Sequence, residues 1–387
     1  MSHSLSVENP TIQFCNRKSL ASFRWPDGES TTRMYLESLV TTPSNEFVRN
    51  VKTDCGLIGI GPHVLPTTIN ETDYDNSWVC SPFNATITYP LDELREIQSR
   101  SLRAALAGLI HVMAPLLKAA QINKVVCVNN WLLSTNLYPP WSGDGLEAIT
   151  TELQQRCPEH AVLFRSLNPI SNGELIQRLT QAGYLLAPSR QIYICSDLHA
   201  AARKQNSEID RELLDRRTQY RVIRHEDLTD ADDDRIRELY DQLYLQKYSV
   251  HNPQFTNELI RLWRTTGLLK MIGLRNPEGV LDGIVGCFGI HRTVTTPLIG
   301  YDLSRPQKLG LYRLLTALVF QEARESNCVL NLSAGAARFK RHRGGEPCLE
   351  FSAVFVRHLP FARRAIWKAL SGLLKNVGAR VLERYEL

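Results

Sequence analysis

A glycine loop between a strand-like run and an amphipathic helix most constrains what this chain can fold into. Residues 297–303 before the loop are apolar enough for a strand, and the leucines and valine of 311–319 recur with the period of a helix that buries one face. Glycine at such a junction lets a ligand approach the backbone, and the first N–H groups of a helix attract anions. We therefore expect a phosphate site made by Gln307, Lys308, Gly310, Leu311 and Tyr312.

The order of elements around the loop supports this interpretation, because a glycine before a helix is more often a simple turn. We expect strands at 220–225, 268–274, 280–291, 297–303, 328–332 and 349–357, and helices at 232–249, 257–266, from 310, and at 336–342. The resulting order is β-α-α-β-β-β-α-β-α-β. It predicts an α/β fold, with helices packed on one mixed sheet.

This order and the loop resemble the GNAT acyltransferase superfamily. Members carry a Q/R-x-x-G-x-G/A loop between the fourth strand and the following helix, and here the loop reads Gln307-x-x-Gly310-x-Tyr312. The resemblance implies that the loop binds the phosphates of an acyl-CoA co-substrate. Tyr312 replaces the last small residue, so the donor phosphates are expected to sit differently from those in a standard member.

A second motif extends the resemblance over residues 220–358. GNAT proteins often carry N-x-x-A-x-x-x-Y-x-x-x-G-F after the fifth strand, and the corresponding residues here are Asn331, Ala336, Ala337, Phe339, Lys340 and Gly344. Phe339-Lys340 followed by Gly344-Gly345 looks like the BioF2-like and FemABX-like branch. The resemblance implies that Asn331 helps to position the acyl group. The tyrosine that commonly protonates the leaving thiolate has no counterpart, because Phe339 has no hydroxyl.

Four further residues are candidates for the same site. Lys340 and Arg343 stand beside the expected donor and carry charges suited to its phosphates. Asp302 ends the fourth strand, where it either orients an amine or caps the next turn. His251 lies in the loop that overhangs the acceptor in GNAT folds, and is either a general base or an ordinary loop histidine.

The first half of the chain resembles the final third of a GNAT unit in degraded form. Strands are expected at 124–128, 161–167 and 191–196, with helices after Gly143-Asp144-Gly145 and at 174–182. No basic residue flanks Asp144 in the sequence, so a phosphate there would meet a like charge. We expect two GNAT-like domains: a degenerate one at 1–200, a connector at 201–218, and a catalytic one at 219–387. An unrelated α/β domain is the alternative for the first.

The composition indicates the cellular compartment and the kinds of site to expect. The nine cysteines form no C-x-x-C pair, which favours reduced thiols in a cytoplasmic protein and no metal site. No charged-then-apolar signal segment opens the chain at 1–19. The longest apolar run, 104–117, is interrupted by His111 and Pro115 and is short for a bilayer, so we expect a buried helix there and no membrane span.

The distribution of charge along the chain indicates which kinds of partner it binds. Residues 336–387 hold eleven Lys or Arg and four Asp or Glu, in a chain whose net charge is +5. This excess suits the phosphates of a coenzyme or of tRNA, whereas DNA is not expected. The sequence predicts an N-acyltransferase that moves an acyl group from acyl-CoA to a small-molecule amine, in specialised or lipid metabolism. The alternatives are a FemABX-like aminoacyltransferase that uses aminoacyl-tRNA and a non-catalytic ligand-binding protein. Oligomeric state is left open.

Overall fold

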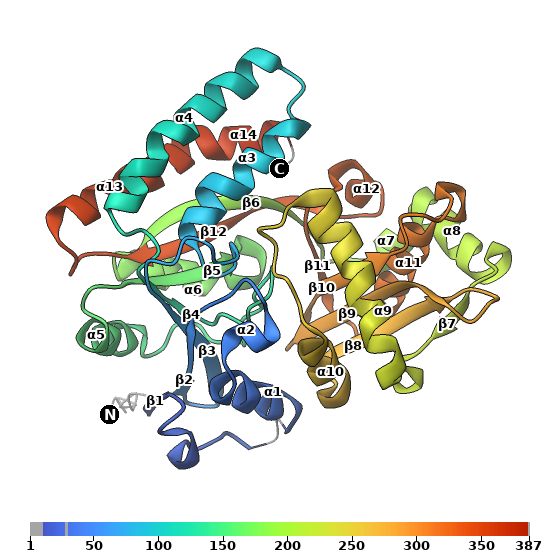
Figure 1. Cartoon of the computed structure of the whole chain (residues 1–387), viewed down its shortest axis with the longest axis horizontal. Coiled ribbons are helices and arrows are strands. Elements are labelled where there is room, and N and C mark those ends of the chain that lie inside the picture. The colour runs from blue at the N-terminus through green and yellow to red at the C-terminus, as the bar shows by residue number, and fades with distance from the viewer. Residues whose placement is uncertain (1–10, 28–29, 386–387) are drawn as a thin grey trace, which may run out of the picture.

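The computed structural model describes residues 11–27 and 30–385 and shows one continuous mixed sheet (Figure 1). Residues 1–10 and 386–387, at the ends of the two predicted domains, lie outside the described residues. The sheet has twelve strands in the order β1-β2-β3-β4-β5-β12-β6-β11-β10-β9-β8-β7. The expected α/β fold class is confirmed.

The two halves of the chain repeat one order of elements. The first half contains β1 Ile12–Cys15, α1 Ser30–Thr41, α2 Ser44–Phe47, β2 Asp54–Ile60, β3 His63–Asn70, β4 Val125–Val128, α5 Leu146–Arg156, β5 Ala161–Leu167, α6 Pro169–Gln181 and β6 Leu185–Cys195. The second contains β7 Arg221–Ile223, α9 Asp230–Asp241, α10 Asn257–Thr266, β8 Leu269–Arg275, β9 Leu281–Ile290, β10 Thr293–Tyr301, α11 Leu311–Glu325, β11 Val329–Ala334, α12 Ala337–Arg341 and β12 Glu346–Phe355. The second half follows the order expected from the sequence, whereas in the first half only the part from β4 onward was expected.

Strand pairing repeats as well. In each half the first four strands pair antiparallel, and the fourth and fifth pair parallel, as β4 with β5 and β10 with β11. The final strands then exchange halves: β6 pairs with β11, and β12 pairs with β5 and β6. The predicted boundaries at residues 200 and 219 therefore divide the chain but not the sheet, and they stay a prediction.

The halves also share a hydrophobic core. Helices α1 and α10 bury side chains of one cluster, among them Leu36, Leu39, Ile260 and Trp263. An isolated bridge joins Val48 to Phe255 beside this cluster. The two halves are thus joined by fully buried side chains of one hydrophobic cluster.

The predicted connector is helical. It forms α7 Leu198–Ala202, α8 Gln205–Glu212 and η4 Leu213–Arg217, a short π-helical segment. All three pack against α11. Buried Asp210 accepts a 2.6 Å hydrogen bond from Arg313 Nε and another of 2.6 Å from Arg343 Nε. Several of the charges that made this segment resemble a linker therefore bind it to the second half.

A layer of helices covers the strands where the two halves meet (Figure 1). It consists of η2 Asn84–Thr88, α3 Tyr89–Glu93, η3 Leu94–Glu96, α4 Arg100–Ala119, α13 Phe361–Leu373, η8 Leu374–Gly378 and α14 Ala379–Tyr385. The expectation of a buried helix at 104–117 is wrong. Leu117 is the buried residue of α4, while Val112 is 67% exposed. By length and composition α4 is also the one helix of the described residues that could span a membrane.

Candidate functional site

The parallel strands β10 and β11 pair over a short stretch and then separate. Thr293, Val294 and Thr295 pair with Val329, Leu330 and Asn331, but β10 continues to Tyr301 and β11 to Ala334 without further pairing to each other. The backbone groups that face the widening gap are therefore not used in that ladder. Helix α11 begins just beyond the same ends of the strands.

The start of α11 has the geometry expected of an anion site. Gly310 is its N-cap with φ +67°, a left-handed conformation that glycine adopts readily. The helix has no acidic residue in its first turn, so its free N–H groups and dipole are not neutralised there. Gln307 and Lys308 are exposed in a 3₁₀ turn before it, while Leu311 is buried in the core.

Tyr312 packs between aromatic side chains of two other elements. Its ring is 6.0 Å from that of Tyr301, at the end of β10, and 4.8 Å from that of Phe339 on α12. Tyr312 and Tyr301 pack against the hydrophobic cluster of the second half. The residue that departs from the motif therefore has a packing role in the fold.

Asn331 and Lys340 are brought together at the end of β11. Asn331 is buried, and its side-chain oxygen accepts a 2.9 Å hydrogen bond from the N–H of Ser333. Lys340 Nζ donates to the carbonyl oxygens of Ser333, at 3.2 Å, and Ala334, at 2.7 Å. Ser333 holds this turn with a left-handed φ of +59°. Both predicted residues therefore contact the same turn of the separated strand.

The Lys340 ammonium is in an unusual environment. Burial, together with the positive charge of Arg190, lowers the pKa of Lys340 to about 7. Near neutral pH its amine is therefore present in both the neutral and the charged form, as a proton-transfer group requires. Its use as a donor-phosphate contact stays a prediction, and its hydrogen bonds aim it at the backbone of β11.

The remaining predicted residues have defined partners. Arg343 is buried, ion-paired with Asp210 and stacked on Phe339 with its guanidinium carbon 3.4 Å from the ring centre. Asp302 accepts hydrogen bonds from Ser304 and, at 2.7 Å, from Arg235, and these bonds offset its burial and lower its pKa. Their assignment to the site stays a prediction, as does that of His251.

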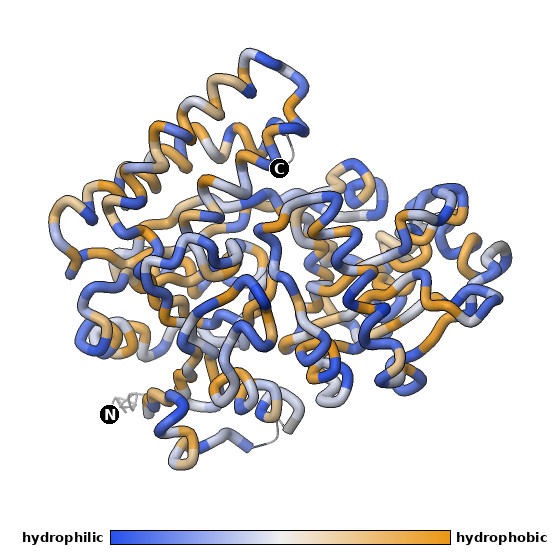
Figure 2. The backbone as a smooth tube through the Cα atoms, viewed as in Figure 1, coloured by the Kyte–Doolittle hydropathy of each residue, from blue (hydrophilic) through white to orange (hydrophobic). Residues whose placement is uncertain are grey.

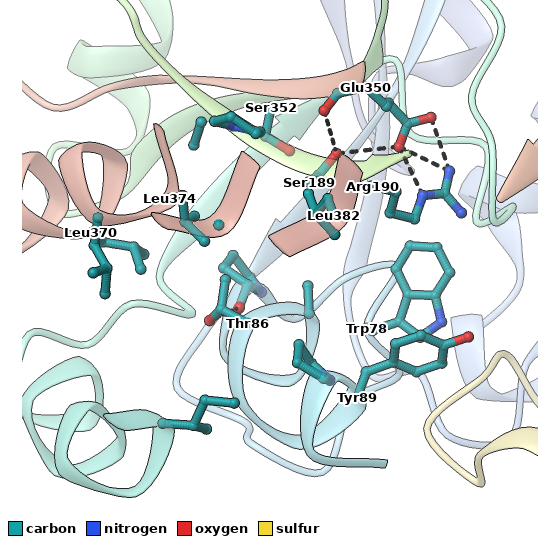
Figure 3. Close-up of a pocket in the computed structure, with 18 of the residues that line it drawn as sticks. Trp78, Thr86, Tyr89, Ser189, Arg190, Glu350, Ser352, Leu370, Leu374 and Leu382 are labelled. Carbon is teal, nitrogen blue, oxygen red and sulfur yellow. Dashed lines mark hydrogen bonds and ion pairs between the residues drawn. The ribbon is translucent and has the colours of Figure 1, made fainter. Parts of the chain in front are cut away.

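His251 lies at the junction with the first half. Its carbonyl oxygen accepts hydrogen bonds from the Ser77 hydroxyl at 2.9 Å and from the Trp78 N–H at 3.2 Å. Trp78 lines a cavity of about 230 Å³ between the helical layer and the sheet (Figure 3). The structure therefore places His251 beside this second feature and does not show it in contact with Asn331 or the loop of α11.

The cavity has apolar walls and a charged floor (Figure 3). Helices α4 and α13 contribute Leu106, Ile110, Met113 and Leu370 to its walls. On its floor Arg190, from β6, donates from Nε and Nη2 to the two carboxylate oxygens of Glu350, from β12, at 2.9 Å each. An amphiphilic molecule matches this combination, with its chain between the helices and its polar end on the floor.

Aromatic and acidic side chains complete the floor. The guanidinium carbons of Arg165 and Arg190 lie 5.0 and 5.1 Å from the centre of the Trp78 ring, within the range of cation–π attraction. Glu93 also lines the cavity. Burial raises the pKa of Glu93 to about 7, although the charge of Arg190 opposes the rise. A second group whose pKa is shifted to about 7 therefore lies within the influence of the Arg190 charge.

Hydrogen bonds connect the cavity floor to the separated strands. Arg190 Nη2 donates to Thr135 Oγ1 at 3.2 Å, and Thr135 Oγ1 is 3.1 Å from Ser333 Oγ. Ser333 is also the residue whose carbonyl oxygen Lys340 contacts. The gap between β10 and β11 and the apolar cavity are thus two ends of one polar network, and we treat them as one candidate site.

Arg190 and Glu350 were not among the predicted site residues. Each interrupts an apolar strand run, in LLAPSRQIYIC and EPCLEFSAVF. Opposite charges placed inside two such runs were the available signal, because charged residues are seldom buried unless they are paired. Among the described residues, no group of three or more His, Cys, Asp or Glu side chains could hold a metal ion.

Comparison with known proteins gives only distant likenesses. No family model matches the sequence, and no curated protein does. Among solved structures, L-PGS from Bacillus licheniformis is 14% identical over 59% of this chain and 79% of its own, with a TM-score of 0.44. FemX is 8% identical over 59% and 78%, with a TM-score of 0.43. A probable N-acyltransferase from Enterococcus faecalis V583 is 9% identical over 90% and 73%, with a TM-score of 0.36. At these values we base function on the site alone.

Proposed function

We propose that this protein is an N-acyltransferase that moves an acyl group from an acyl-CoA thioester to an amine. The observation that carries the proposal is the separation of β10 and β11 beside the start of α11. The gap offers unpaired backbone groups to the acyl-bearing arm of a donor, and the free N–H groups of α11 offer an anion site for its phosphates. The order of strands around these two features supports the proposal, because the family resemblance implies a donor site at this position.

The chemistry needs positioning and one proton acceptor. The amine nitrogen attacks the thioester carbonyl carbon, the tetrahedral intermediate expels the thiolate, and the amine loses a proton. Lys340 is our candidate for receiving that proton, directly or through water, because its amine contacts the turn at the end of β11 and is partly neutral near pH 7. Asn331 shapes the same turn. The apolar cavity would hold the chain of an amphiphilic substrate.

Coenzyme A binding tests the donor site. In thermal unfolding, coenzyme A should stabilise the wild type, and Gly310→Asp should abolish the effect because its carboxylate would lie where phosphates bind. Gly310→Asn is the matched control: it has nearly the same shape, it also tolerates a left-handed φ, and it lacks the charge. Equal stabilisation of all three proteins would refute the assignment of this loop.

Turnover tests the reaction itself. Mass spectrometry after incubation with acyl-CoA donors and a panel of amines should detect N-acylated products together with free coenzyme A. Lys340→Met should lower kcat more than it raises KM, since the proposed role is proton transfer and not donor binding. Coenzyme A binding without turnover of any tested pair would instead favour the non-catalytic ligand-binding alternative, which the absent tyrosine hydroxyl at Phe339 supports.

Aminoacyl-tRNA is the second candidate donor, favoured by the basic excess at the C-terminal end of the chain. A tRNA makes many phosphate contacts, so its affinity should fall about a thousandfold between about 50 and 200 mM salt. Coenzyme A, with few phosphates, should show a shallow dependence. Tight, steeply salt-dependent binding of aminoacyl-tRNA with no response to coenzyme A would replace our first proposal with this one. With either donor we propose a cytoplasmic reaction, supported by nine free thiols.

A further inference from the structure

Helix α4 exposes an apolar stripe. Leu109, Val112 and Leu116, spaced three and four residues apart, are 37%, 67% and 53% exposed. The neighbouring positions Ala104, Ala105, Gly108 and Ala119 are also exposed and carry no polar side chain, and the exposed polar residues of α4 include Ser101, His111 and Lys118. Figure 2 shows hydrophobic positions recurring along this helix at the edge of the molecule. A continuous apolar stripe facing solvent over several turns is unusual for a surface helix, whose outer face is normally polar.

The other side of α4 is apolar too, but it faces the cavity. Leu106, Ile110 and Met113 line the cavity together with Leu109 at the border of the outer stripe, and Leu374 and Val377 of η8 line it as well. Helix α4 packs against η2 and η3, and at its C-terminal end Leu117 shares a hydrophobic cluster with Trp367 and Leu370 of α13. An apolar molecule entering between these helices would therefore pass from an apolar outer surface into an apolar cavity.

Positive charge marks the helices α4, α13, η8 and α14 of this layer, whereas its segments α3 and η3 carry Asp92, Glu93 and Glu96. Helix α4 has no acidic residue, and the α13–α14 segment has Glu383 alone among its described residues. Together they carry the basic residues Arg100, Arg103, Lys118, Arg363, Arg364, Lys368, Lys375, Arg380 and Arg384. Phe361, at the start of α13, is 77% exposed. Exposed apolar side chains accompanied by basic ones are the combination that interfacial helices use on anionic membranes.

We propose that the layer of α4, α13, η8 and α14 docks on the surface of an anionic lipid bilayer, with the outer stripe of α4 in the headgroup region. The cavity between these helices would then open toward the membrane. The docking itself does not depend on the proposed acyltransfer. Combined with it, docking would supply an amphiphilic substrate to the cavity directly from the bilayer.

The same observations argue against other occupants. A second copy paired symmetrically through this face would bring two basic layers together, which is unfavourable. A membrane-spanning α4 would have to leave the cavity that Leu106, Ile110 and Met113 line. Surface docking uses the outer stripe and leaves the inner one in place.

Vesicle sedimentation tests the proposal on the full chain. We expect binding to vesicles of equal parts phosphatidylglycerol and phosphatidylcholine, and much weaker binding to phosphatidylcholine alone. Val112→Glu should weaken binding to the anionic vesicles by about tenfold or more, because a carboxylate would replace an inserted apolar side chain. Ile170→Glu is the matched control: Ile170 is 48% exposed on α6, outside the layer, and its substitution should change nothing.

A second variant addresses the charges. Lys375→Glu combined with Arg380→Glu should reduce binding to anionic vesicles while the protein keeps the wild-type unfolding temperature. The absence of wild-type binding to the anionic vesicles would overturn the proposal, as would equal losses in Val112→Glu and Ile170→Glu. Light scattering provides the other outcome: a dimer that Val112→Glu dissociates would show that a second copy, and not a bilayer, covers this face.

Discussion

The two halves of the molecule use one framework and differ at the helix that follows the fourth strand. Both α5 and α11 start after a left-handed glycine, Gly145 with φ +77° and Gly310 with φ +67°. The first turn of α5 contains Glu147, whereas the first turn of α11 has Tyr312 at the equivalent position and no acid. An acidic side chain already satisfies the dipole of α5, whereas the dipole of α11 has no such partner in its first turn, as the proposed anion site requires.

A similar contrast holds for the fifth strands. The chain reads Leu163-Phe164-Arg165-Ser166 in β5 and Leu330-Asn331-Leu332-Ser333 in β11, and both serines have a left-handed φ, +61° and +59°. Phe164 packs in the core where the second half has Asn331. The repeated turn thus remains in both halves, while the polar group suited to a substrate is present in one. The framework therefore keeps the same turn in both halves, while the side chains placed on it differ.

The largest effect is expected at the ion pair that joins the exchanged strands. Arg190→Ala would leave Glu350 buried without its partner, and we expect a loss of about 3–5 kcal/mol in the free energy of unfolding by urea denaturation. Arg33→Ala breaks an exposed pair with Glu37 and should cost less than about 1 kcal/mol. Similar losses for the two variants would show that the exchanged strands do not depend on this pair.

The matched glycines provide the next test. At a coenzyme A concentration about a hundred times its Kd, bound ligand should stabilise the wild type by about 2.7 kcal/mol. Gly310→Asp should lose all of this stabilisation, while Gly145→Asp should keep it. Ligand titrations followed by unfolding would measure both. Loss in the Gly145 variant would mean that the first half takes part in donor binding.

The pH dependence of stability should distinguish Glu93 from Lys340, the two buried groups whose pKa values are shifted to about 7. Burial raises the pKa of Glu93, so the folded protein binds more protons than the unfolded chain between the usual pKa of a carboxyl and about 7, and stability falls as pH rises through this window. Burial lowers the pKa of Lys340, so stability rises from about pH 7 toward the ordinary lysine value. Each group contributes a slope of up to about 1.4 kcal/mol per pH unit.

Single substitutions separate the two slopes. Glu93→Gln should remove the fall below pH 7 and leave the rise above it, and Lys340→Met should do the reverse. Urea unfolding measured across both windows would check this. An unchanged profile in Lys340→Met would show that this amine stays charged in the fold.

The smallest effect concerns the first turn of α5. Glu147→Gln removes a charge that favours the helix dipole and should cost about 0.3–0.5 kcal/mol at low salt, with the loss fading as salt is added. Tyr312→Glu places the same acid on α11 and should weaken coenzyme A binding instead. If Tyr312→Glu left that binding unchanged, the contrast between the two helix starts would have no functional meaning.

The second half was more predictable from sequence than the first. Helix α10 has the bounds expected for it, because its apolar period is regular and Thr256 caps it, and β9 Leu281–Ile290 differs by one residue at each end from the expected strand at 280–291. Strands β2 and β3 were not foreseen, since Gly56, Gly59 and Pro66 interrupt them and such residues usually exclude strands. Strand β6 begins at Leu185 and not near 191, because Pro188 and Arg190 disguise its first part.

For the candidate site, local sequence identified the residues of single turns but not the partners that tertiary structure brings to them. Gly310, Asn331 and Lys340 could be found because each belongs to a short motif. The pairing of Asp210 with Arg343 could not, since it joins residues 133 positions apart and depends on how the connector packs. The exposure of α4 likewise depends on the absence of a covering element, which composition does not reveal.

The exchange of β6 and β12 affects how the chain folds during its synthesis. While the chain is being synthesised, β5 and β6 wait with open edges until residues 346–355 emerge, because β12 lies between them. The first half therefore cannot complete its sheet before nearly the whole chain has left the ribosome, and long-range pairing of this kind slows folding and exposes strand edges to aggregation. The edges of β5 and β6 thus stay unpaired from the synthesis of these strands until that of β12, close to the end of the chain.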